Sequence, residues 1–82
     1  MAEKKRHRLV DWNEDAKGLL ALVEQKLTTQ PRKEFRDWLL EQKRVLLYSN
    51  EVEFIGHMLK MDNEGMIDAA ILILKGAVEN AD

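Results

Sequence analysis

The sequence predicts an all-α fold, a compact bundle of about four short helices, from three observations. Apolar residues recur at helical spacing along most of the chain, turn-forming residues divide this pattern into four segments, and there is no cysteine for a disulfide framework. At 82 residues the chain can build one hydrophobic core, and its 45% hydrophobic and 34% charged residues are typical of a globular domain. We therefore expect a single helical domain over residues 11–82 after a basic, flexible tail over residues 1–10.

The first helix is expected to begin at Trp12. From Trp12 to Leu27 the apolar residues recur at steps of one, three and four, which places them on one helical face. Asp11 followed by Glu14 forms a capping-box pattern, in which side-chain oxygens accept unpaired backbone N–H groups at a helix start. The helix should end before Thr28–Pro31, which breaks the apolar pattern.

Pro31 marks the expected start of the second helix, because proline is tolerated in the first turn of a helix and not in its interior. A stripe at helical spacing then extends from Phe35 to Ser49 and is mostly apolar. It comprises Phe35, Trp38, Leu39, Gln42, Val45, Leu46 and Ser49, with Leu40 and Leu47 to one side, and this width indicates contact with more than one neighbour. The segment Val45–Tyr48 is also compatible with a strand, but no second strand of matching pattern is found to pair with it.

The third and fourth helices are separated by a turn. Asn50 followed by Glu53 is another capping-box pattern, and it predicts a short third helix that ends near Met61. Turn-forming residues follow at Asp62–Gly65, so the chain should reverse direction before Met66, where the fourth helix begins.

The fourth helix is apolar on two faces about 120° apart, given the helical step of about 100° per residue. One apolar stripe comprises Ile67, Ala70, Ile71, Leu74 and Val78. The second stripe comprises Met66, Ala69, Ile73 and Ala77. Three short helices can cover one stripe but must also bury their own apolar faces. We therefore favour a homodimer with the C-terminal helix near the interface over a monomer in which this helix is central.

The candidate protein interface consists of the second stripe and two nearby methionines. Its residues are Met66, Ala69, Ile73, Ala77, Met58 and Met61. Met58, Met61 and Met66 are flexible and can line an adaptable binding groove, although core filling at a helix junction is the interpretation that we favour for these methionines.

We recognise neither a catalytic nor a metal-binding constellation and expect a protein that is not an enzyme and needs no cofactor. Ser49 and Asn50 end one helix and cap the next, which accounts for them without a reaction. Glu53 and His57 are four positions apart, but a metal would need further ligands, so we interpret them as a surface hydrogen bond. His7 lies in the predicted tail.

The charge distribution leaves open a nucleic-acid function. The net charge is −2, but residues 1–8 carry four basic residues against one acidic, and residues 51–82 carry two lysines against seven acidic residues. A polyanion would therefore bind the tail and the second helix. The candidate residues are Lys4, Lys5, Arg6, Arg8, Arg32, Arg36 and Lys43. Acidic neighbours interrupt the basic residues of the second helix, which is typical of a solvated helix face, so nucleic acid is the alternative and not our main hypothesis.

We expect a small helical adaptor or regulator that acts through protein–protein contacts, with a homodimer and a protein target as its partners. Its size suits an inhibitor or assembly factor of bacterial or phage type. The first ten residues lack the apolar run of a secretory signal, and the apolar stretch Met66–Val78 is shorter than the roughly 20 residues that span a bilayer. We therefore expect a cytoplasmic location and no membrane association.

Overall fold

The computed structural model describes residues 8–12, 14, 16–42 and 44–81, and in this part of the chain the predicted helical fold is confirmed with the addition of a small sheet. The elements follow in the order β1 (Arg8–Asp11), α1 (Lys17–Lys26), α2 (Gln30–Leu40), β2 (Arg44–Leu47), α3 (Ser49–Lys60) and α4 (Glu64–Glu79). β1 includes residues 8–10, which we assigned to the tail, whereas residues 1–7 lie outside the described residues.

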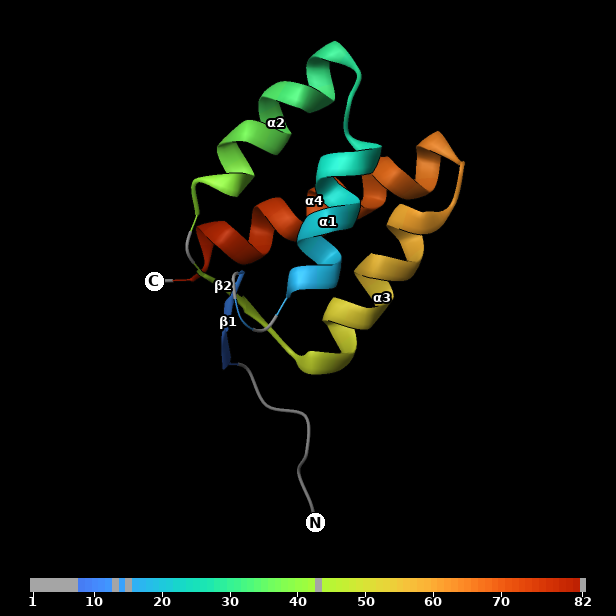
Figure 1. Ribbon diagram of the computed structural model, residues 1–82. Coiled ribbons are helices and arrows are strands. Elements are labelled where there is room, and N and C mark those ends of the chain that lie inside the picture. Colours follow the sequence, from blue (N-terminus) through green and yellow to red (C-terminus); the bar gives the residue numbers. More distant parts are fainter. Residues whose placement is uncertain (1–7, 13, 15, 43, 82) are drawn as a thin grey trace.

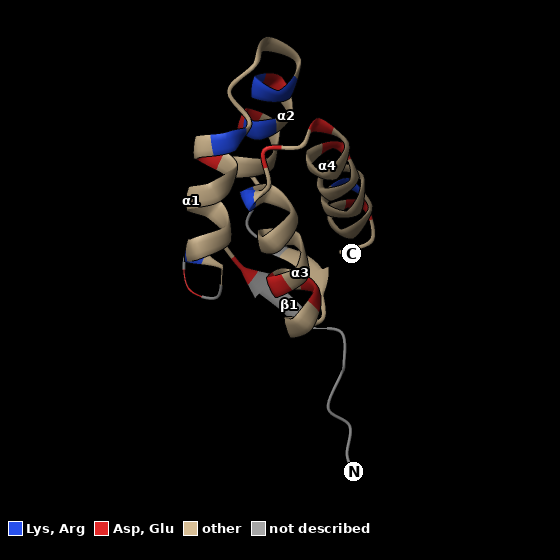
Figure 2. Ribbon diagram, turned by 90° about the vertical axis from the view of Figure 1, so that its right-hand side faces the viewer, with Lys and Arg blue, Asp and Glu red and all other residues tan. Residues whose placement is uncertain are grey.

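Helices α1 and α3 run side by side in the same direction, and α3 lies between α1 and α4 (Figures 1 and 2). The parallel arrangement follows from the sheet, because β1 leads into α1 and β2 leads into α3, so both helices begin at the same end of the molecule. The α3–α4 turn lies at the far end of the bundle from the sheet, and α2 lies above and to one side of α1 (Figure 1).

The sheet overturns our expectation that the second helix continues to Ser49. β1 and β2 pair in antiparallel register, with Arg8 opposite Leu47 and Asp11 opposite Arg44. Val45 and Leu47 are buried whereas Leu46 between them is partly exposed, which is the two-residue alternation of a strand. The partner that the sequence pattern lacked is β1, and it provides hydrogen-bond partners for the edge of β2 that faces it, without a helix.

Helix α2 ends at Leu40 because its last carbonyl groups are satisfied locally. The backbone N–H of Gln42 donates to the carbonyl oxygen of Leu39 at 3.0 Å, and its side-chain Nε2 donates to the carbonyl oxygen of Trp38 at 3.1 Å. These hydrogen bonds end the helix, and the chain continues into β2.

The first helix also begins later than its apolar spacing predicts. The carbonyl oxygen of Asp11 accepts the backbone N–H groups of Glu14, at 3.1 Å, and of Ala16, at 3.3 Å, so the chain turns here before α1 starts at Lys17. Asp11 belongs to β1, and the pairing of that strand holds the start of the turn in place. Trp12 is therefore buried from a turn and not from a helix.

The caps of α3 and α4 differ in how well their sequence patterns predict them. α3 begins at Ser49, and the carboxylate of Glu51 accepts the backbone N–H of Tyr48 at 2.8 Å, so the cap lies two residues before the predicted one. α4 begins at Glu64, within the predicted turn. The side-chain oxygen of Asn63 accepts the backbone N–H groups of Gly65 and Met66 at 2.8 and 3.3 Å.

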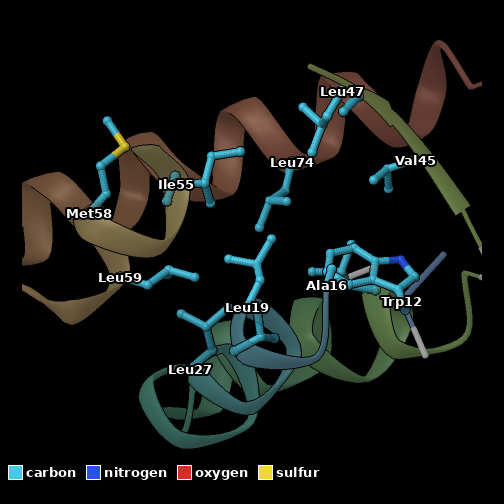
Figure 3. Packing of buried hydrophobic residues seen from close by; sticks show 14 of the residues in the cluster. Trp12, Ala16, Leu19, Leu27, Val45, Leu47, Ile55, Met58, Leu59 and Leu74 are labelled. Carbon is cyan, nitrogen blue, oxygen red and sulfur yellow. The ribbon is translucent and has the colours of Figure 1, made fainter. Parts of the chain in front are cut away.

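The core lies where α1, α3 and α4 meet, with β2 at one side. Leu19 of α1, Leu59 of α3 and Leu74 of α4 point into the same space, and Val45 and Leu47 of β2 flank it (Figure 3). These side chains are buried, and α4 contributes its first apolar stripe to the same cluster. β2 therefore covers part of α4 that we expected a helix to cover.

Two ion pairs hold the ends of the helices together. Lys26 at the end of α1 donates to Asp62 in the α3–α4 turn at 2.7 Å. This hydrogen bond and the lysine charge lower the pKa of Asp62 below its usual range. Because the folded pKa is the lower one, the contribution of the pair to stability is present at neutral pH and is lost as the pH falls through the lowered pKa. Arg32 of α2 likewise donates to Asp68 of α4 at 2.8 Å.

Candidate protein-binding surfaces

The outer face of α4 is apolar and partly exposed, with one largely exposed side chain at its centre, Leu72. We define this face by Ala69, Leu72, Ile73 and Gly76, whose spacing of three, four and seven positions places them on one side of the helix. Leu72 is 71% exposed, Ala69 and Ile73 are partly buried, and a Cβ added to Gly76 would meet no atom within 4 Å. Gly76 therefore leaves open space beside the larger apolar side chains of this face. Such a combination of small and large residues is suited to packing against another helix.

The structure divides the predicted interface residues into three groups. Met58 and Ala77 are buried in the core. Met66, Ala69 and Ile73 are partly buried, and Met61 is 41% exposed. The chain thus buries most of the first stripe of α4, whereas the second stripe is partly buried except for Ala77.

Three exposed apolar residues of the described chain were missing from the predicted interface: Leu72 of α4, Phe54 of α3, which is 55% exposed, and Trp38 of α2, which is 37% exposed. The exposure of Leu72 could have been predicted from the sequence. Leu72 lies at helical spacing from the charged residues Asp68, Lys75 and Glu79, on the side of the helix that faces away from the core. Phe54 lies four positions before the buried Met58, which is a core spacing, so helical periodicity alone assigns it to the core and is wrong at this position.

A second surface is an open groove of about 650 Å³ between α1 and α3. The groove exists because the residues that α1 and α3 contribute to its surface include small ones. These are Gly18 and Ala21 on α1 and Gly56 on α3. Leu19, Leu22 and Val52 supply apolar walls. We refer to it as the α1–α3 groove; its lining residues are Ala16, Gly18, Leu19, Ala21, Leu22, Gln25, Val52, Glu53, Gly56, His57 and Lys60.

The α3 edge of the groove carries charge. Glu53, His57 and Lys60 lie three and four positions apart along α3 and are exposed. No hydrogen bond or ion pair within the described part of the chain involves these three side chains, so the surface hydrogen bond expected between Glu53 and His57 is not formed. The α1 edge, with Gly18, Ala21 and Gln25, is uncharged.

Gly56 offers a direct test of the space in this groove. A Cβ added there would lie 3.9 Å from the Cδ1 atoms of Leu19 and Leu22, which is an ordinary contact. We expect Gly56→Ala to raise the free energy of unfolding by about 0.5–1 kcal/mol, because alanine loses less backbone entropy in a helix interior. Thermal unfolding should show an increase of several degrees. A decrease would mean that the groove is closed at this point.

Among the candidate nucleic-acid residues, the two arginines of α2 are engaged with carboxylates. Arg32 binds Asp68, and Arg36 binds Asp37 at 2.6 Å. Figure 2 shows basic and acidic residues close together around α2 and α4. Arg8 is paired through its backbone with Leu47. Four further candidates lie outside the described residues, Lys4, Lys5, Arg6 and Lys43.

Within residues 8–12, 14, 16–42 and 44–81, no group of three or more histidine, aspartate or glutamate side chains is arranged to hold a metal ion. In the same part of the chain, every helix is too short or too polar to cross a bilayer. Comparisons with protein families, with curated proteins and with solved structures found no match to this chain.

Proposed function

We propose that this chain is a non-catalytic protein-binding domain that pairs with a second copy through the outer face of α4 and presents its remaining surfaces to a target protein. The observation that carries the proposal is the exposure of Leu72 in the middle of that face, beside Ile73 and between the small residues Ala69 and Gly76. An apolar face of this kind is stabilised when another protein surface removes it from water.

The face is complementary to itself in an antiparallel arrangement. If two α4 helices cross at a two-fold axis between Leu72 and Ile73, Ala69 lies opposite the partner's Gly76 and Leu72 lies opposite the partner's Ile73. Small residues then meet small ones and large residues meet large ones, and the two helix dipoles oppose each other, which is favourable.

The expected affinity follows from the size of the face. Complete burial of a leucine or isoleucine contributes about 1.5–3 kcal/mol, and Ile73 is already partly buried in one copy. Two such residues from each copy must offset an association cost of about 4–15 kcal/mol. Only the largest gain combined with the smallest cost leaves the roughly 8 kcal/mol of a micromolar complex, so we expect a weak dimer whose Kd is micromolar at the tightest and whose population depends on concentration.

Light scattering over a range of concentrations tests this proposal. The wild-type mass should rise from 9.6 kDa toward twice that value with increasing concentration. Leu72→Glu should remain near 9.6 kDa with an unchanged circular dichroism spectrum, since Leu72 is exposed and its replacement leaves the core intact.

The matched control is Ala21→Glu, which adds the same charge at an exposed helical position on α1 and should dimerise like the wild type. Ile73→Glu should weaken the dimer as Leu72→Glu does, with some loss of stability because Ile73 is partly buried. A wild-type mass that stays near 9.6 kDa at millimolar concentration would rule out pairing through α4.

A further inference from the structure

We infer that the α1–α3 groove is the docking site for an amphipathic helix of a partner protein, bound antiparallel to α1 and α3. The inference rests on the proposed protein-binding role but concerns a different surface, since α4 contributes no residue to the groove. α3 separates the groove from α4, so a dimer formed through α4 would leave both of its grooves accessible (Figure 2).

The shape of the groove fits a helix. Its exposed residues on α1 are spaced by three, four and seven positions, from Gly18 to Gln25, and those on α3 repeat the same spacing from Glu53 to Lys60. Two parallel helical rows with glycine or alanine between them form a trough into which the apolar side chains of a third helix can enter. The seven positions along α3 correspond to about 10 Å, or two helical turns.

The openness of the groove distinguishes a helix from a small molecule. Sites for small molecules bury most of the ligand surface, about 70–90%. This groove is open to solvent and not enclosed, so a small ligand would leave a substantial part of its surface in water. A helix that binds with one apolar face and leaves its polar face in solvent matches such an open site.

The charges along the α3 edge select the orientation of the bound helix. Glu53 lies near the end of the groove where α1 and α3 begin, and Lys60 lies at the other end. Helices are stabilised by acidic residues in their first turn and basic residues in their last. A partner helix with this distribution places its acidic end beside Lys60 and its basic end beside Glu53 only when it runs antiparallel to α3. Its dipole then also opposes those of α1 and α3.

Two synthetic peptides of about 14 residues, near the minimum length for an isolated helix, would test the inference. Both would have one composition and leucines spaced by three, four and seven positions. The acid-first peptide would carry glutamates in the first turn and lysines in the last, and the base-first peptide the reverse. Fluorescence anisotropy would measure their affinity for the full chain. We expect the acid-first peptide to bind more tightly than the base-first peptide.

The double variant Glu53→Lys, Lys60→Glu separates groove recognition from the helicity of the peptides, because the same two peptides are compared on both proteins. The ratio of the two affinities should change by at least about threefold in favour of the base-first peptide, as expected for two exposed ion pairs that become repulsive. An unchanged ratio would overturn the proposed orientation.

Two further variants test the location of the site. Ala21→Arg places a long side chain over the groove at an exposed position, and Gly56→Leu fills its floor. Each should weaken binding of the acid-first peptide at least tenfold. If both bind it like the wild type, or if the wild type binds neither peptide, the groove is not a helix-docking site.

Leu72→Glu distinguishes the two proposals. This variant should bind the acid-first peptide like the wild type even when it is monomeric, because Leu72 does not line the groove. Loss of peptide binding in Leu72→Glu would show that the peptide docks on α4 instead. A dimeric wild type that binds neither peptide would retain the pairing through α4 and remove the groove proposal alone.

Discussion

Ile55→Ala is expected to lower the free energy of unfolding by about 2–5 kcal/mol, which is a large share of the stability of a domain this small. Ile55 is fully buried on α3 and faces the space that α4 shares with it (Figure 3). Its truncation removes apolar contacts and leaves a cavity that the surrounding helices can close only in part. Urea unfolding followed by circular dichroism would show a lower midpoint with an unchanged slope.

The neighbouring Phe54 provides the control for this prediction. Its side chain is 55% exposed on the same helix, so Phe54→Ala should change the free energy of unfolding by less than about 1 kcal/mol. Equal losses for the two variants would mean that Phe54 is covered in solution, and the distinction between core and surface on α3 would have to be revised.

Leu47→Asp is expected to unfold the domain at room temperature. Leu47 is 2% exposed on β2, and a carboxylate placed there would be buried without a partner, at a cost of several kcal/mol. Leu46→Asp should fold with reduced stability, because the side chain of residue 46 is partly exposed. Far-ultraviolet circular dichroism and thermal unfolding of the two variants provide the comparison.

This pair of variants also decides between a strand and a helix for residues 45–48. In the helix expected from apolar spacing, Leu46 lies on the apolar stripe and Leu47 lies to one side, so Leu46→Asp would be the more harmful change. In the strand, Leu47 faces the core and the order is reversed. Greater damage from Leu46→Asp would contradict the pairing of β1 with β2.

The helices could be predicted where their signals are local. The turn at residues 62–65 was predicted because turn-forming residues and a glycine act locally, and in the structure the side chain of Asn63 caps α4 there. The sheet could not be predicted in the same way. β1 contains only Leu9 and Val10 between charged residues, and its pairing with β2 joins segments separated by residues 12–43. Helical spacing therefore remained the stronger local pattern for residues 45–48, and residues 8–10 were assigned to the tail.

The two candidate surfaces were predictable to different degrees. Helix periodicity assigned Ala69 and Ile73 to an exposed stripe, but it also included Ala77, which is buried in the core. The α1–α3 groove has no sequence signal of its own. It depends on Gly18, Ala21 and Gly56 lying on facing sides of two helices, and their proximity becomes evident only when the helices are placed side by side.

The pairing of β1 with β2 also sets an order in which the chain can assemble. α3 and α4 are neighbours in sequence and can dock after a short turn, whereas β1 must find β2 across residues 12–43, so the entropic penalty for joining them is larger. Once formed, α1 and α2 shorten the path between the two strands. The two strands should therefore pair late during refolding and separate first under mild denaturing conditions.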